Sequence, residues 1–233
     1  MKTAKLKNVK VSTSTNGHFL NEGNAKSTVQ SGLDRLIISL DGTEQDTYSS
    51  YRIGGSFDKV TKGISEIIRQ KKEAGSSKPK IILQFLVLKT NEHQISEIKI
   101  LGHQLGVDAV EIKSAQFYDF RNGNPLMPGN PRYCRYTSTE TGYGNKAYRI
   151  RNRMPRHCFR MWSSCVITWD GWVVPCCYDK DAKYRMGNLN ADSFQKIWTN
   201  KKYRDFRQRI IHARETIDIC MNCAEGMGIT RIL

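Results

Sequence analysis

The chain has 233 residues and seven cysteines, and its 37 lysines and arginines against 22 acidic residues give a formal net charge of +15. This length suits one moderate core, or one domain with a smaller appendage. No run of about 18 apolar residues occurs, and no apolar segment follows Met1, which argues against a membrane span and a secretory signal. We therefore expect a cytoplasmic protein with reduced thiols, and not a disulfide scaffold.

The first half of the chain predicts strands that alternate with helices. A β-rich run over residues 6–14 ends at the turn Thr15-Asn16-Gly17, and a helix is expected over 20–30. The later elements are expected at 36–40 (strand), 57–74 (helix), 81–88 (strand), 95–105 (helix) and 109–113 (strand). The strand at 36–40 is nearly all apolar, which is typical of a parallel sheet buried on both faces. Strands separated by helices in this way predict right-handed βαβ crossovers.

Residues 114–157 lose this periodicity, and we expect a long linker or insertion there. No acid lies between Thr141 and Trp169, while the same stretch holds several basic residues: Lys146, Arg149, Arg151, Arg153, Arg156 and Arg160. A second basic group accompanies a predicted helix: Lys201, Lys202, Arg204, Arg207, Arg209 and Arg214. Such patches attract polyanions, including nucleic acid. The alternatives are a solvated surface, or positive charge that balances an anionic cluster and its thiolates.

The last third of the chain carries cysteines at spacings typical of metal ligands: Cys158, Cys176, Cys177, Cys220 and Cys223. Asp170-Gly171 lies between two apolar runs and predicts a hairpin that fixes the thiol following it, and helices are expected at 192–199 and 201–213. Four thiolates suit either a [4Fe–4S] cluster or a tetrahedral zinc ion. Two further cysteines, Cys134 and Cys165, are interpreted as packed thiols, and the four tryptophans as core of this module.

From about Val9 to Cys223, the chain resembles a radical SAM enzyme with a C-terminal SPASM or twitch domain. The most specific motifs are Cys158-x12-Gly171-x4-Cys176, Gly187-Asn188-Leu189 and Cys220-x2-Cys223. The resemblance implies an α/β fold: an incomplete (β/α) radical SAM-type partial barrel over residues 1–115, a basic linker over 116–157 and a SPASM/twitch module over 158–233.

The resemblance also implies the ligands and cofactors. One auxiliary [4Fe–4S] cluster is expected on Cys158, Cys176, Cys220 and Cys223, with Cys177 as the alternative to Cys176. Asn16, Ser39 and Asp41 follow or end the predicted strands that lie against SAM in relatives, so the resemblance implies that they bind this cofactor. For these three the alternative is structural: a turn at Asn16 and a helix cap at Ser39 or Asp41.

The chain departs from the family at its front. Radical SAM enzymes hold their SAM-cleaving cluster through CxxxCxxC, but no cysteine precedes Cys134 here and no such spacing occurs. In intact relatives, a 5′-deoxyadenosyl radical generated from SAM modifies a peptide or small molecule. This chain is expected to bind the auxiliary cluster alone, and SAM only if a complementing N-terminal fragment is supplied. We assign no catalytic residue. The alternative function is a zinc-stabilised protein that binds nucleic acid without catalysis.

Overall fold

The structure is a computed structural model that describes residues 1–140, 146–151, 158–223 and 230–232. The chain forms two compact units, one of Met1–Arg149 with Gly228–Leu233 and one of Ile150–Met227. Each unit is described by itself below. No helix in the described part of the chain is long and apolar enough to cross a membrane.

The first unit is built on one sheet with the strand order β1-β2-β3-β4-β10. Its strands are β1 (Ser12–Thr15), β2 (Arg35–Ser39), β3 (Lys80–Val87), β4 (Ala109–Ser114) and β10 (Thr230–Ile232). The first four are parallel, with Thr15 opposite Ile38, Ser39 opposite Gln84 and Val87 opposite Ser114. This arrangement confirms the predicted parallel α/β fold. The short antiparallel strand β10, which pairs with β4, was not expected from the sequence.

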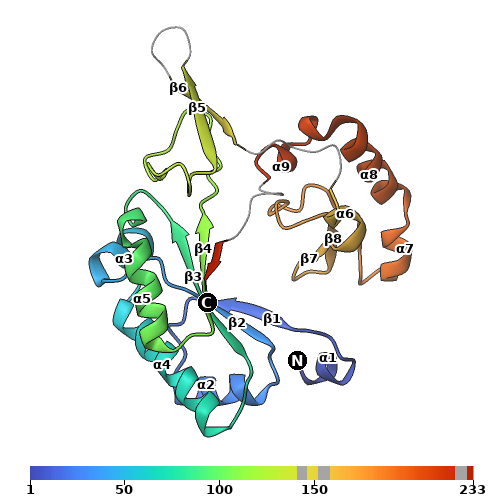
Figure 1. The fold of residues 1–233 in the computed structure, drawn as a ribbon. Coiled ribbons are helices and arrows are strands. Elements are labelled where there is room, and N and C mark those ends of the chain that lie inside the picture. Colours follow the sequence, from blue (N-terminus) through green and yellow to red (C-terminus); the bar gives the residue numbers. More distant parts are fainter. Residues whose placement is uncertain (141–145, 152–157, 224–229, 233) are drawn as a thin grey trace. The chain divides into compact units, whose positions relative to one another are not determined.

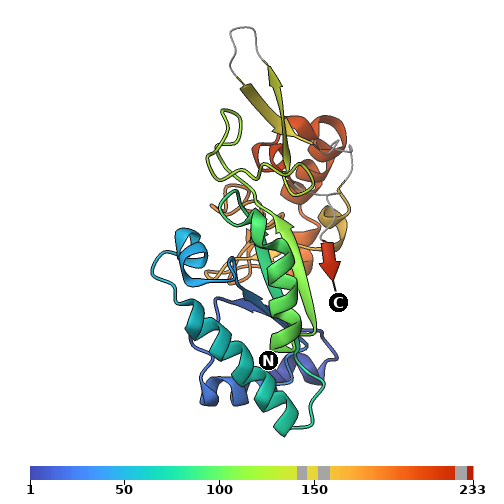
Figure 2. The ribbon, with the colours of Figure 1, turned by 60° about the vertical axis from the view of Figure 1, so that its left-hand side comes forward.

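Helices connect the parallel strands and cover one face of the sheet (Figure 1 and Figure 2). The longer helices are α2 (Glu22–Gln30), α4 (Phe57–Glu73) and α5 (Ile95–Leu105), and the short ones are α1 (Lys2–Leu6), α3 (Gln45–Tyr51) and the 3-10 turn η1 (Glu92–Gln94). The side chains of Asn21 and Ser56 accept backbone N–H groups at the starts of α2 and α4, as helix N-caps do. Gly106 ends α5 in the left-handed conformation.

The two faces of the sheet differ in polarity. Leu36, Ile38 and Leu83 on β2 and β3 are buried in a core with the three longer helices. On the opposite face, Ser39 and Gln84 are half-buried and in register with Glu111, whose carboxylate pairs with Arg35. The expectation of burial on both faces was therefore wrong for β2. Because alternate side chains point to opposite faces, one side of this strand is apolar and the other is partly polar.

Two aspartates, Asp34 before β2 and Asp108 before β4, form hydrogen bonds at the amino ends of the parallel strands. Asp34 accepts hydrogen bonds from Lys5, from Lys78 at 2.5 Å and from the Val11 amide at 2.8 Å, and these contacts lower its pKa. Asp108 accepts from the Ile81 amide at 2.7 Å and from two lysines. Burial alone would raise the Asp108 pKa, but the hydrogen bonds together outweigh burial and lower it.

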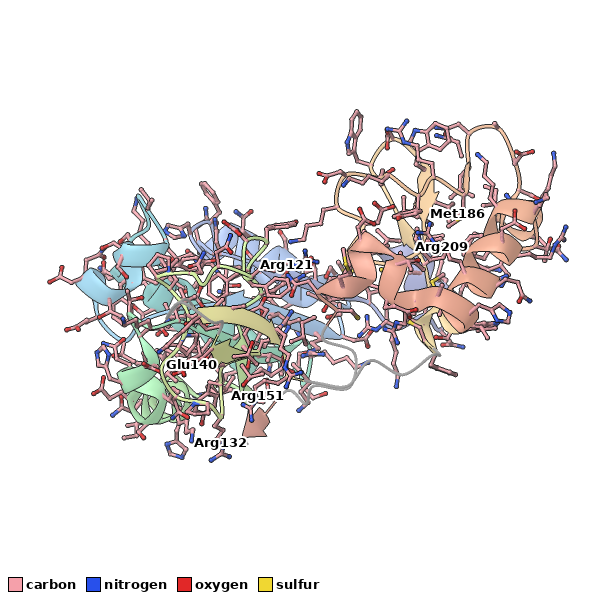
Figure 3. The ribbon with its side chains drawn as sticks, turned by 90° about the horizontal axis from the view of Figure 1, so that it is seen from above. Arg121, Arg132, Glu140, Arg151, Met186 and Arg209 are labelled. Atoms are coloured by element: carbon pink, nitrogen blue, oxygen red, sulfur yellow. The ribbon has the colours of Figure 1, made fainter. Side chains whose placement is uncertain are left out.

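The segment after β4 contains a two-stranded sheet where the sequence predicted no regular structure. Strands β5 (Tyr136–Glu140) and β6 (Lys146–Ile150) form a separate two-stranded sheet, and the Tyr148 amide donates to the Arg121 carbonyl at 2.9 Å. Figure 3 labels Arg121, Arg132 and Glu140 in this region. Two residues of the first basic group, Arg153 and Arg156, lie outside the described residues.

The second unit combines a small sheet with short helices. The sheet has the order β7-β8-β9, from β7 (Val166–Ile167), β8 (Trp172–Val174) and β9 (Gly187–Asn188). The helices are α6 (Arg160–Ser163), α7 (Phe194–Trp198), α8 (Lys201–Ala213), the 3-10 turn η2 (Arg214–Thr216) and α9 (Asp218–Met221). Its core contains Val173, Met186, Tyr203 and Ile210 together with Cys158 and Cys220. Figure 3 labels Met186 and, on α8, Arg209.

The predicted hairpin at Asp170-Gly171 is confirmed, but the prediction for the tryptophans was partly wrong. Trp169 is 99% exposed at the turn, and Trp162 is 45% exposed. Trp198 does pack against the core, with its ring 4.9 Å from that of Tyr203. The tryptophans of this module are therefore not all part of its hydrophobic core.

Candidate metal centre

Four thiols of the second unit come from three segments of the chain. Cys158 lies just before α6, Cys176 follows β8, Cys220 belongs to α9, and Cys223 lies two residues beyond that helix. Cys158, Cys220 and Cys223 are buried, and Cys176 is half-buried. The Cys223 amide donates to the Cys220 carbonyl at 3.0 Å, so a tight turn places these two thiols next to each other in the fold.

The hairpin before Cys176 depends on Gly171. This residue has a φ of +87°, a conformation that side chains disfavour. A Cβ there would lie 2.9 Å from Asn190 Nδ2 and 3.0 Å from Asn188 Oδ1. Both asparagine side chains donate to the Asp170 carbonyl, at 3.1 Å from Asn188 and 3.2 Å from Asn190. The glycine in the cysteine motif thus allows the turn to close against β9 and the segment after it.

The thiols of this region influence one another electrostatically. Burial raises the pKa of Cys176 to about 12, a hydrogen bond with the Tyr178 backbone opposes this, and the charges of Cys177, Cys220 and Cys223 add to the rise. Burial likewise raises the pKa of Cys220 to about 11, with Cys223 and Cys158 adding to it and Arg214 opposing it. The four predicted ligands are therefore brought into one electrostatic neighbourhood.

The remaining cysteines are placed differently. Cys177 is exposed, Cys165 is half-buried with its pKa raised by burial, and Cys134 is buried in the first unit. Within the described ranges, no three His, Cys, Asp or Glu side chains are arranged so that they could hold one metal ion.

The surroundings of the four thiols suit an anionic sulfur-ligated group. Soft thiolate donors are the ligands of iron–sulfur clusters and of structural zinc. The guanidinium of Arg214 is buried in the same place, with Nη2 3.7 Å from Cys223 Sγ. A buried cation beside thiols compensates the negative charge that ligand thiolates carry. The chemistry of the donors and the charge beside them therefore suit a sulfur-ligated cluster, while no three donors in the described part of the chain are arranged to hold a single metal ion.

The sequence did not single out Arg214 or Tyr203 as site residues. Arg214 was counted only within a basic group, although it stands six positions before Cys220, and Tyr203 lies on α8 among charged residues. They were missed because they lie outside the cysteine motif in the sequence. The one available signal was a basic residue, Arg214, shortly before the Cys-x2-Cys pair, which could have indicated a cation near the thiols.

In the first unit, Asn16 and Ser39 lie near the carboxyl ends of β1 and β2. Asn16 Oδ1 accepts the His18 amide at 3.2 Å, which is an Asx turn, and His18 Nε2 accepts the Ser56 amide at 2.9 Å. Ser39 is the last residue of β2 and is half-buried. Because parallel strands end at one edge of the sheet, both residues lie where α/β folds bind ligands.

Asp41 is held firmly by its own neighbours. Its carboxylate pairs with Arg52 at 2.6 Å and accepts the Leu86 amide at 2.7 Å, while its carbonyl accepts from Asn91 at 3.0 Å. Burial raises the pKa of Asp41, and Arg52 and the amide oppose this rise. The carboxylate thus joins the chain after β2 to α3 and β3. A contact of Asp41 with a cofactor remains a prediction.

Comparison with known proteins agrees with this architecture. Residues 158–224 match the SPASM family, described as an iron–sulfur cluster-binding domain. The tungsten-containing aldehyde ferredoxin oxidoreductase cofactor-modifying protein of Pyrococcus furiosus is 27% identical over 226 residues, covering 83% of this chain and 60% of its own length. An AdoMet-dependent heme synthase of Nitratidesulfovibrio vulgaris is 24% identical, covering 84% of this chain and 59% of its own length.

Solved structures share the fold. SuiB of Streptococcus suis has a TM-score of 0.59 at 13% identity, covering 89% of this chain and 53% of that one. The protein anSMEcpe, solved with bound AdoMet and a Cp18Cys peptide, has a TM-score of 0.59 at 14% identity, covering 94% of this chain and 68% of that one. The chain spans about three fifths of the length of the curated relatives it matches. The chain thus combines a parallel α/β sheet, whose fold is shared with a structure solved with bound AdoMet, with residues 158–224 that match the SPASM domain.

Proposed function

We propose that this chain binds one auxiliary [4Fe–4S] cluster through Cys158, Cys176, Cys220 and Cys223. The observation that carries the proposal is the convergence of four thiols from three segments, within the residues that match an iron–sulfur domain: the charges of Cys220 and Cys223 act on Cys176, and those of Cys223 and Cys158 act on Cys220. Such a cluster, when bound, supplies electron transfer or a site for substrate. The protein contributes the buried thiols and a compensating arginine.

The choice of Cys176 over Cys177 rests on burial and coupling. Cys177 is exposed, whereas Cys176 is half-buried and feels the charges of both members of the Cys220-x2-Cys223 pair. A cluster ligand must face the other ligands. We therefore assign Cys176 as the ligand and Cys177 as its solvent-facing neighbour.

Metal analysis after anaerobic purification tests this proposal. We expect a brown protein with about four irons and four sulfides per chain, and with negligible zinc. The double variant Cys220→Ala/Cys223→Ala should lose both iron and sulfide. Cys134→Ala is the matched control, since that thiol is buried in the other unit, and it should retain them. A colourless protein with one zinc per chain would overturn the proposal and favour the zinc-stabilised alternative.

We further propose that radical chemistry on a peptide or small molecule requires a separate N-terminal segment that carries CxxxCxxC. Relatives solved with AdoMet share this fold, and the present sequence lacks that motif. Asn16, Ser39 and Asp41 would then line the cofactor edge of the completed sheet. The expected result is that the chain alone forms no 5′-deoxyadenosine from SAM and dithionite. Addition of the corresponding segment of the Pyrococcus furiosus relative should restore this product, and formation without it would contradict the proposal.

A further inference from the structure

Arg135, the residue before β5, carries a buried guanidinium with unpaired donors. The residue is 9% exposed, and its Nη2 donates to the Ser114 carbonyl at 3.3 Å. Its Nε and Nη1 have no hydrogen-bond partner within the described residues. An arginine stays protonated inside a protein, and a carbonyl is a neutral acceptor. The hydrogen bond to Ser114 therefore leaves the positive charge of Arg135 unbalanced.

This arrangement lowers the stability of the fold. Burial of a charged group is unfavourable unless an opposite charge and hydrogen bonds compensate it, and its replacement by an apolar side chain of similar volume is often stabilising. An apolar side chain before β5 would fill the same space without that cost. Departures of this kind from the rules of stability are expected at sites that bind a ligand. A bound anion therefore explains Arg135 better than packing does.

The guanidinium of Arg135 lies at the carboxyl edge of the sheet. Ser114, whose carbonyl it contacts, is the last residue of β4 and is in register with Val87, the last residue of β3. Ser39 ends β2 at the same edge. Ligands of open parallel α/β sheets bind outside the carboxyl ends of the strands. The unpaired donors are thus located where this fold is expected to hold a ligand.

The chain on both sides of Arg135 is fixed by the protein itself. Before it, the Tyr133 amide donates to the Asn130 carbonyl at 3.1 Å, and the Tyr133 side chain is buried in the core of the first unit. After it, the Tyr136 hydroxyl accepts the Phe117 amide at 2.8 Å, which joins β5 to the segment that follows β4. A group that is held in place before its ligand arrives loses less conformational freedom on binding.

The chemistry and the burial of Arg135 select a small oxyanion. A planar guanidinium presents several N–H groups that match the oxygens of a carboxylate or a phosphate. The net charge of +15 favours the approach of anions in general. A nucleic acid lying across the surface contacts exposed cations through its backbone, whereas a guanidinium of a residue that is 9% exposed suits a single terminal group.

We propose that Arg135 forms an oxyanion site at the carboxyl end of β4, which takes the carboxylate or phosphate group of a small-molecule substrate. The site belongs to the first unit and does not involve the thiols of the second. Its use for a substrate rests on the radical chemistry proposed above for the completed sheet. In that chemistry, Arg135 binds and orients the substrate and takes no part in breaking a bond.

Titration of the full, anaerobically purified chain with inorganic phosphate and with acetate tests this site, at an ionic strength held constant with sodium chloride. The readout is the 1H–15N NMR signal of the Arg135 Nε–H group, assigned by its absence from the spectrum of Arg135→Met. We expect a saturable shift of this signal with at least one of the two anions. A shift with phosphate alone identifies a phosphate group as the ligand, and a shift with acetate alone identifies a carboxylate.

Calorimetric titration of variants measures the contribution of the guanidinium. Arg135→Met should weaken binding of the anion about tenfold or more. Arg135→Lys, which keeps the charge but loses the planar donors, should weaken it by a smaller factor. Arg132→Met is the matched control, because Arg132, labelled in Figure 3, is exposed and belongs to the same segment. This control should keep the affinity of the wild type.

Thermal unfolding followed by circular dichroism gives a second readout. In anion-free buffer, Arg135→Met should unfold at a higher temperature than the wild type, and the anion should stabilise the wild type but not this variant. Lack of a saturable NMR shift with both anions, or equal affinities of the wild type and Arg135→Met, would overturn the proposal. An Arg135→Met variant less stable than the wild type without anion would assign Arg135 to the fold and overturn it as well. Iron analysis of the same samples tests cluster binding separately, and 5′-deoxyadenosine formation tests the radical chemistry, so each proposal can fail independently.

Discussion

Replacing Gly171 with alanine should weaken the hairpin that positions Cys176. The residue adopts a φ of +87°, and a non-glycine residue in left-handed conformation costs about 1–2 kcal/mol. The new Cβ would also lie 2.9 Å from Asn190 Nδ2, which must shift. That shift disturbs one of the two asparagine hydrogen bonds to the Asp170 carbonyl, worth about 0.5–1.5 kcal/mol. The free energy of unfolding of the module should therefore fall by about 1.5–3.5 kcal/mol.

Tryptophan fluorescence during urea unfolding provides a selective assay. All four tryptophans lie between Trp162 and Trp198, so their fluorescence follows the second unit alone, while far-UV circular dichroism follows both units. The measurement is made anaerobically on cluster-loaded protein, because a bound metal centre contributes to folding stability.

Gly75→Ala is the matched control for this substitution. Gly75 also has a positive φ, +56°, but a Cβ there meets nothing within 4 Å, and it follows α4 in the first unit. We expect it to lower the stability of that unit by about 1 kcal/mol and to leave the fluorescence transition in place. A fluorescence transition of Gly171→Ala within about 0.5 kcal/mol of the wild type would refute the reasoning.

Three further predictions concern the first unit. Ser56→Ala removes the side-chain cap of α4 and should lower the free energy of unfolding by about 1 kcal/mol, measured by circular dichroism in urea. The control Ser65→Ala, on the exposed face of the same helix, should be nearly neutral, and equal effects of the two variants would contradict the capping role. The hydrogen bonds that lower the pKa values of Asp34 and Asp108 stabilise the folded state as long as both carboxylates are ionised. This stabilisation should be complete above the unfolded pKa of about 3.9 and should be lost as the pH falls from there through the lower folded pKa values. Acid titrations should show this loss reduced in an Asp34→Asn/Asp108→Asn variant, and an unchanged profile would count against it. Asp41→Asn should lower the free energy of unfolding by about 2 kcal/mol, measured by thermal unfolding. This is less than the loss of a fully buried ion pair, because the side chain of its partner Arg52 is 33% exposed. Unchanged stability would show that the ion pair does not support the fold.

The sequence predicted those elements of the fold that a strong periodic signal marks. The helix α4 was evident from apolar residues at helical spacing, and β3 from a continuous apolar run. By contrast, α3 has a single buried residue, Tyr48, and therefore no apolar stripe to detect. The strand β10 has only three residues, and its antiparallel pairing with β4 depends on tertiary structure rather than on local pattern.

For the candidate site as well, some residues were predictable from the sequence and others were not. The cysteine spacing identified the four thiols because the turns that hold them, at Gly171 and between Cys220 and Cys223, are local. The charged and polar residues around the thiols were not predictable, because α8 brings Tyr203 to the site through packing of the module core. Exposure of Trp169 was missed for the related reason that composition does not reveal that this residue lies in the turn between β7 and β8 with its side chain in solvent.

The most direct test of the account is the iron and sulfide content of single cysteine-to-alanine variants after anaerobic purification, made at every cysteine of the chain. We predict that loss of both elements follows substitution of the four coupled thiols, Cys158, Cys176, Cys220 and Cys223. Full content should be retained on substitution of Cys134, Cys165 or Cys177. Retention of a complete cluster in any one of the first four variants, or its loss from Cys177→Ala with retention in Cys176→Ala, would contradict the proposed ligand set.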